Sequence, residues 1–253
     1  MSGDGSTLAV GAPGHGGLVG VYTFDLGEWH PKGGKITQEV IGSLSITSVS
    51  LARNGKTLAF GGVAGSSEKV AHMFEFDITS GDWAELGNGL LSTQDGTAYI
   101  VSLSGDGTTV GISNYYYLET NPGNLNDAID VRAYKWSEES SAWTQLGQSL
   151  HTSAKGEKEG YFISMSDDGL TMVMGDPGRQ GAGNGGNTGH AHVYMYDGTE
   201  WYQFGDNMYG DAAGDHFGYD VAVSGDGKRF GKFPRPYCAK THPAEVCLSH
   251  TPF

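Results

Sequence analysis

The chain is poor in cysteine, in basic residues and in long apolar runs, and each shortage excludes a class of protein. Its only two cysteines, Cys238 and Cys247, lie near the C-terminal end, so the rest of the chain folds without a disulfide framework. No run of 18 apolar residues occurs, which argues against a membrane-spanning helix. Lys and Arg number 15 against 29 Asp and Glu, a formal net charge of −14. Nucleic acid is therefore not an expected partner, because phosphate binding needs basic side chains.

Glycine is abundant, with 42 residues, whereas charged residues make up only 17% of the chain. This balance favours short strands joined by tight turns over helices, in which glycine is destabilising. Apolar residues reach 38%, enough for a packed core rather than a disordered chain. The first residues lack the basic and apolar regions of a signal peptide, so compartment stays open.

A four-residue turn motif recurs along the chain. Three copies read Ser-Gly-Asp-Gly, one reads Ser-Asp-Asp-Gly, and one keeps only Asn-Gly; the five copies are residues 2–5, 104–107, 224–227, 166–169 and 52–55. Every copy except the one at 224–227 is followed, after one variable residue, by Thr and a short apolar run. Asp and Gly in such a turn predict a hairpin in which Gly takes a positive φ.

Between the turns, three more features recur in the same order. They are an alternating strand, a strand that carries a tryptophan and an alternating strand that leads into the next turn; the tryptophans are Trp29, Trp83, Trp143 and Trp201. Four strands in each repeat of some 50 to 60 residues is the arrangement of a β-propeller blade. Stacking such blades buries both faces of each sheet, which one sheet alone cannot do. We therefore predict an all-β propeller of four-stranded antiparallel blades, about four of them plus a partial one.

The predicted propeller covers residues 1–231. Two segments, 114–130 and 178–189, are expected to be expanded loops between the second and third strands, because they account for the longer repeats. Residues 232–253 carry four of the eight prolines and both cysteines, without strand alternation, and are expected to be a non-repeat tail. The turn motif at both ends suggests a piece of a longer propeller.

None of the motifs carries a clear catalytic or metal signature. A turn with one Asp offers too few oxygens for calcium, which takes six to eight, so the turn is interpreted as structural and no cofactor is expected. His190 and His192 share one face of a strand, a geometry that can bind zinc or copper, but no third ligand lies nearby in sequence. Asp211, Asp215 and His216 are interpreted as a solvated loop. No metal site and no catalytic residue are predicted.

Residues 214–227, Gly-Asp-His-Phe-Gly-Tyr-Asp-Val-Ala-Val-Ser-Gly-Asp-Gly, taken with residues 2–13, which end in Gly-Ala-Pro, resemble one FG-GAP repeat. This unit is found in the integrin α-chain propeller and, more closely, in multi-copy FG-GAP-like proteins of algae and other protists. The resemblance implies a propeller at the cell surface or secreted, but the family's Asp-rich calcium loop is missing. Kelch repeats are the second likeness, from 61–62 through 76–77 to Trp83.

We expect a non-enzymatic binding, adhesion or scaffold module that uses loops on one propeller face, with a protein or glycan ligand. The expected contact residues lie in the first long segment: Asn114, Tyr115, Tyr116 and Tyr117. One alternative is a propeller hydrolase or lyase acting on carbohydrate, which needs paired carboxylates at the channel mouth. The other is a truncated gene product without independent function.

Overall fold

The computed structural model describes residues 1–12, 18–37, 44–63, 69–91, 97–119, 125–151, 162–177 and 188–233. These residues form strands and turns without a helix, so they include no helix long and apolar enough to cross a membrane. The predicted all-β fold is confirmed. Of the expected tail at 232–253, residues 232 and 233 end a strand, and residues 234–253, with Cys238 and Cys247, lie outside the described residues.

The strands form five antiparallel sheets, numbered sheets 1 to 5 in chain order. Sheet 1 contains β1 (Thr7–Ala12), β2 (Leu18–Asp25) and β3 (Glu28–Pro31). Sheet 2 contains β4 (Ser45–Leu51), β5 (Thr57–Val63), β6 (Lys69–Asp77), β7 (Asp82–Glu85) and β8 (Leu90–Leu91). Sheet 3 contains β9 (Thr97–Leu103), β10 (Thr109–Glu119), β11 (Leu125–Ser137) and β12 (Ala142–His151). Each sheet follows the order of the sequence repeat.

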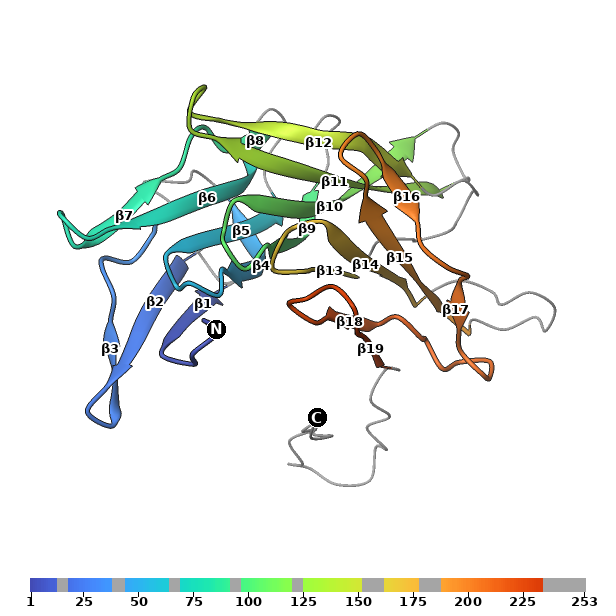
Figure 1. Cartoon of the computed structure of the whole chain (residues 1–253), viewed down its shortest axis with the longest axis horizontal. Coiled ribbons are helices and arrows are strands. Elements are labelled where there is room, and N and C mark those ends of the chain that lie inside the picture. Colours follow the sequence, from blue (N-terminus) through green and yellow to red (C-terminus); the bar gives the residue numbers. More distant parts are fainter. Residues whose placement is uncertain are drawn as a thin grey trace.

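Sheet 4 contains β13 (Phe162–Met165), β14 (Thr171–Asp176), β15 (His190–Tyr196), β16 (Trp201–Gln203) and β17 (Met208–Tyr209). Sheet 5, within the described part of the chain, contains β18 (Asp220–Val223) and β19 (Phe230–Phe233). The sheets fan around a central region in which β4, β9, β13 and β18 lie innermost (Figure 1). Sheets 2 to 4 each contain the four consecutive strands of a blade, to which sheets 2 and 4 add the short strands β8 and β17; sheets 1 and 5 show three and two strands among the described residues.

The core consists of four clusters, one between each pair of successive sheets. Between sheets 2 and 3, for example, Met73 packs with Val101 and Ile112. The clusters between the other pairs have the same layout and are centred on Phe60, on Met172 and on Val193. Apolar residues on both faces of a strand are thereby buried, as in β5 and β14, where almost every residue is buried. This is the stacking that the repeated sequence predicts.

The recurring tryptophan connects each sheet to the one before it. The indole Nε1 of Trp83 donates to the Lys32 carbonyl, 2.7 Å away, and Trp143 and Trp201 make the equivalent bonds to Leu86 and Leu146. In each case the acceptor lies three residues after the tryptophan position of the preceding sheet. The next residue in that sheet is a glycine with positive φ, against which the indole packs. The tryptophan thus fills a socket on its neighbour.

Candidate functional site

The turn motif satisfies its own polar groups. In the first copy, the Gly5 N–H donates to the Ser2 carbonyl (3.1 Å), and Gly5 has a φ of 74°. The Asp4 carboxylate accepts from the Ser2 hydroxyl (2.6 Å) and from the Ser6 N–H (2.9 Å), while the Ser2 hydroxyl accepts from the Thr7 N–H (2.8 Å). The same bonds form in the copies at 104–107, 166–169 and 224–227. The aspartate therefore acts within its own hairpin.

These hydrogen bonds lower the pKa of Asp4, Asp106 and Asp226. The Ser2 hydroxyl, helped by the Ser6 N–H, lowers the pKa of Asp4 to about 2. The Ser224 hydroxyl lowers the pKa of Asp226 in the same way. Burial raises the pKa of Asp106, but the Ser104 hydroxyl and other hydrogen bonds outweigh it, and the net shift is downward. Such groups are poor proton donors at neutral pH.

The five turns bond to one another in series through their backbones. Gly3 N–H donates to the Arg53 carbonyl (2.8 Å), Asn54 N–H to Gly105 (3.3 Å), Gly105 N–H to Asp167 (3.0 Å) and Asp167 N–H to Gly225 (3.0 Å). Each of the first four turns thus donates to the turn of the next sheet, and the turns gather at one end of the axis. This series ties all five sheets together at the centre.

The threonine that follows the motif packs its side chain against the turn glycine of the next sheet. The side chain of Thr7 lies against Gly55 of the next turn, and Thr57, Thr109 and Thr171 lie in the same way against Gly107, Gly169 and Gly227. A Cβ on Gly169 would lie 2.6 Å from Thr109 Cβ, so only glycine fits there. The last copy carries Arg229 at the threonine position. The recurrence of Thr and Gly is therefore a packing requirement.

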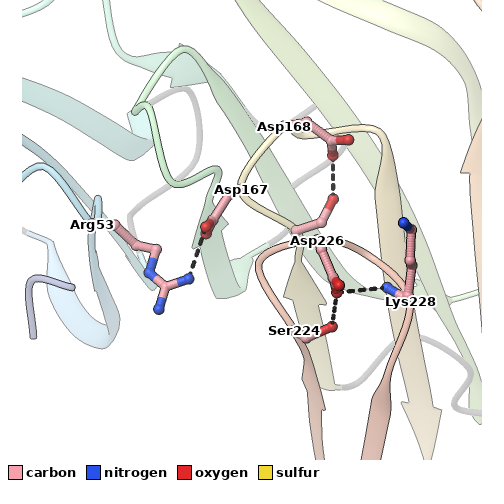
Figure 2. A network of polar contacts seen from close by, with 7 residues as sticks. Arg53, Asp167, Asp168, Ser224, Asp226 and Lys228 are labelled. Carbon is pink, nitrogen blue, oxygen red and sulfur yellow. Dashed lines mark hydrogen bonds and ion pairs between the residues drawn. The ribbon is translucent and has the colours of Figure 1, made fainter.

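An ion pair occupies the centre of the turn cluster. Arg53 Nη1 lies 2.7 Å from Asp167 Oδ2, across 114 residues of sequence. Both residues hold the second position of their turns, where the other three copies have Gly3, Gly105 and Gly225. A Cβ on Gly105 would lie 2.5 Å from Asp167 Oδ1, and one on Gly225 would overlap both partners. The three glycines thus make room for one ion pair, which is drawn in Figure 2.

Figure 2 shows Asp168 and Asp226 beside this pair, each held by its own turn. The pair itself is half exposed, with 56% of the Arg53 side chain and 43% of the Asp167 side chain accessible to solvent. The result is a packed, polar cap over one end of the axis, the turn cap, formed by the five motifs at 2–5, 52–55, 104–107, 166–169 and 224–227. Sequence reasoning missed its centre. The signal was present, since the two copies that lack glycine at the second position carry opposite charges.

The expected loop at 114–130 is mostly strand, and this prediction was wrong. Residues 114–119 continue β10 and residues 125–130 begin β11, paired from Asn114↔Asp130 to Glu119↔Leu125. Tyrosines at 115–117 favour an extended strand, so the extra length becomes a longer hairpin. For Tyr115, Tyr116 and Tyr117 the structure describes the backbone only. The other expected loop, 178–189, lies outside the described residues except for its last two positions.

Asn114 belongs to a buried polar network. Its Nδ2 donates to Asp130 Oδ1 (3.0 Å), and Asp130 Oδ2 accepts from Arg132 Nε (2.7 Å). Asp130 is fully buried and the Arg132 side chain is 16% exposed. Burial lowers the pKa of Arg132, but the charge of Asp130 outweighs this and the net shift is upward. The Asn114 amide is thus engaged within sheet 3.

The equivalent register in sheet 4 pairs Asp176 with His190. Both are fully buried, with His190 Nδ1 4.0 Å from Asp176 Oδ2, and the His192 ring stands edge-on to His190 at 4.4 Å between centroids. The two histidines share one side of β15, as their spacing predicts. Within the described ranges, no three His, Cys, Asp or Glu side chains gather to hold a metal.

The Phe-Gly pair of the resemblance lies between sheets 4 and 5. Phe217 is buried in the cluster with Val193 and Val221, and its N–H donates to the Thr188 carbonyl (2.9 Å). Gly218 has a φ of 86° and its backbone approaches Gly175 so closely that neither residue can carry a Cβ. The motif therefore allows two backbones to pack directly together.

The sheets, their inner strands and the turns between first and second strands define a β-propeller, and the solved structures agree with this class. A protein of Bacteroides uniformis assigned as a 6-phosphogluconolactonase matches with a TM-score of 0.52 and 11% identity, over 88% of this chain and 61% of that one. The tricorn protease matches with a TM-score of 0.50 and 9% identity, over 87% and 21%. A nidogen/laminin complex chain matches with a TM-score of 0.45 and 9% identity, over 86% and 65%.

At these identities the likeness shows the fold alone. The chain spans less than two thirds of each of these three structures. No family model and no curated protein matches the sequence. The FG-GAP and Kelch resemblances therefore stay predictions, while the propeller architecture is confirmed.

Proposed function

We propose that this protein is a non-enzymatic binding or scaffold module. The observation that supports this most directly is the turn cap, in which the central groups already serve the fold. Arg53 and Asp167 bind each other, and the turn aspartates bind their own serines. A substrate at this end of the axis would have to replace these bonds. The cap therefore suits a rigid frame better than a reaction centre.

The carbohydrate hydrolase or lyase alternative is less favoured at this face. Acidic groups do gather here, as that alternative requires, but a general acid needs a raised pKa. The pKa values of Asp4, Asp106 and Asp226 are lowered instead. These carboxylates stay ionised at neutral pH and would serve an acid–base mechanism badly.

The ligand of the proposed module would be a protein or a glycan. The FG-GAP resemblance of residues 214–227 supports an adhesion-type role at a cell surface, and the acidic charge of −14 favours a partner that is neutral or basic. The expected contact surface is the end of the propeller opposite the turn cap, where the long hairpin of β10 and β11 ends. Asn114 lies at the base of that hairpin.

The test combines binding and turnover on the same folded chain. Glycan and protein arrays should give saturable ligands, while a panel of glycoside and lactone substrates should remain unchanged. Asp167→Asn and Asp226→Asn variants serve as controls. Turnover that disappears in either variant would refute the proposal and assign an enzyme to the turn cap.

A further inference from the structure

The interface between successive sheets has two parts, a tryptophan on one sheet and the socket that receives it on the preceding sheet. Both parts are present together three times, and each part is also present once without the other among the described residues. Trp83, Trp143 and Trp201 each fill a socket on the preceding sheet, formed by a carbonyl and the positive-φ glycine after it. Trp29 holds the same repeat position in sheet 1 but is 43% exposed, beside Phe24 at 47%. We call this exposed aromatic pair the knob.

The matching open socket lies on sheet 4. Phe204 and Gly205 hold the positions that Leu146 and Gly147 hold on sheet 3, and Gly205 has the same backbone shape, with a φ of 76° against 70° for Gly147. A Cβ on Gly147 would meet Trp201 at 2.8 Å, whereas one on Gly205 would meet no atom of the described chain within 4 Å. Phe204 is 52% exposed.

Sheet 5 lies between the open socket and the knob. Its turn and the turn of sheet 1 both lie against Arg53 of the sheet 2 turn: a Cβ on Gly3 would lie 3.1 Å from Arg53 Nε, and one on Gly225 would overlap the same guanidinium. Sheets 5 and 1 are the last and first of the series and stand at the two ends of the fan of sheets (Figure 1). Among the described residues, however, sheet 5 has only β18 and β19, the first and second strands of a blade. The positions of its third and fourth strands adjoin β19, the socket and the knob.

We propose that this edge binds a β-hairpin of another chain, built like the third and fourth strands of sheets 2 to 4. Such a hairpin would extend β19 by backbone hydrogen bonds. Its tryptophan would enter the socket at Phe204 and Gly205, and its own glycine four residues later would receive Trp29. The required sequence is an alternating apolar strand that ends in an aromatic residue, a short turn, and then Trp-x-x-Leu-Gly.

A second copy of this chain fits the edge less well. In a second copy the knob, on β2 and β3, comes together with β1, which is the second strand of that blade. That position is already taken by β19. The high negative charge of −14 also opposes association of two copies. A free hairpin without a second strand avoids both conflicts.

The probe is a peptide with the sequence of residues 69–87, which are β6, β7 and the turn between them through Gly87. A disulfide between added terminal cysteines preorganises the hairpin. Titration calorimetry with the full chain should give saturable binding. A Trp83→Ala version of the peptide should bind at least about tenfold more weakly, because a buried tryptophan is a typical anchor.

The chain variants isolate the socket. Gly205→Asn keeps a residue that tolerates positive φ and places its side chain in the socket, so it should weaken binding at least about tenfold. Gly81→Asn is the matched control, since Gly81 has a φ of 72° and also has open space around it, and it should bind normally. Thermal unfolding checks that both variants are folded. This test does not depend on the loop-face ligand.

Three results would overturn the proposal. They are the absence of saturable binding up to about 1 mM peptide, equal binding by the Trp83→Ala peptide, and equal binding by Gly205→Asn and Gly81→Asn. Concentration-dependent dimers of the chain alone, abolished by Gly205→Asn, would also overturn it by making a second copy the occupant of this edge.

Discussion

The socket model predicts that equivalent tryptophans differ greatly in their effect on stability. Trp143 is 8% exposed, and its Nε1 donates to the Leu86 carbonyl at 2.9 Å. Replacing such a buried tryptophan by alanine should cost about 3–5 kcal/mol of unfolding free energy. For a chain of this size, each kcal/mol lowers the unfolding midpoint by about 2–4 °C, so we expect a drop of roughly 6–20 °C. Trp143→Phe keeps most of the packing and loses the hydrogen bond, which should cost about 1–2 kcal/mol.

Trp29→Ala is the internal control, because Trp29 holds the same repeat position but is 43% exposed. It should cost about 1 kcal/mol or less. The unfolding midpoints and urea titrations of the three variants, followed by far-ultraviolet circular dichroism, measure the difference. If Trp29→Ala destabilises the chain as much as Trp143→Ala, the recurrence of tryptophan does not reflect packing between sheets and the reasoning fails.

Three other predictions concern the turn cap. In urea unfolding, Gly107→Ala should be more destabilising than Gly81→Ala by about 1–3 kcal/mol. Both glycines have a positive φ, but only Gly107 lies against a threonine of the preceding sheet. Equal losses of unfolding free energy would contradict this. The folded pKa of Asp4 is about 2, below the ordinary value of 3.8. The contribution of Asp4 to the free energy of unfolding is therefore present above pH 3.8 and is lost as the pH falls toward 2. An Asp4 pKa near 3.8 in an NMR titration would refute this. A double-mutant cycle of Arg53→Ala and Asp167→Ala should give a coupling of about 0.2–1 kcal/mol, reduced in about 1 M salt; a coupling above about 2 kcal/mol would contradict the exposed setting of the pair.

Local sequence patterns predict the repeating parts of this protein. Each turn glycine and each strand alternation depends on residues close by in the chain, so the hairpins and the propeller class follow from the sequence. The recurrence of Trp201 and its equivalents likewise indicates a packing position. What these patterns omit is how one repeat meets the next around the axis.

The long hairpin shows the limit within a single sheet. Asn114 and the three tyrosines after it lie between two recognisable strands, which suggested a loop. The structure instead extends β10 and β11, because each lengthened strand supplies the backbone partners of the other. Asp130 is buried by that pairing and is satisfied by Arg132 and Asn114. Burial of this kind depends on partners that the sequence does not mark.

The sequence alone determined the number of turns, their shape and the all-β architecture, since these depend on neighbouring residues. Only the tertiary structure decided that the second positions of five separate turns meet on one axis, where Arg53 and Asp167 pair across 114 residues and three glycines leave them room. It also decided that Trp29 is exposed while Trp83, Trp143 and Trp201 are buried. The physical reason is that these environments depend on which sheet lies next to each residue, and one repeat carries no information about its neighbour.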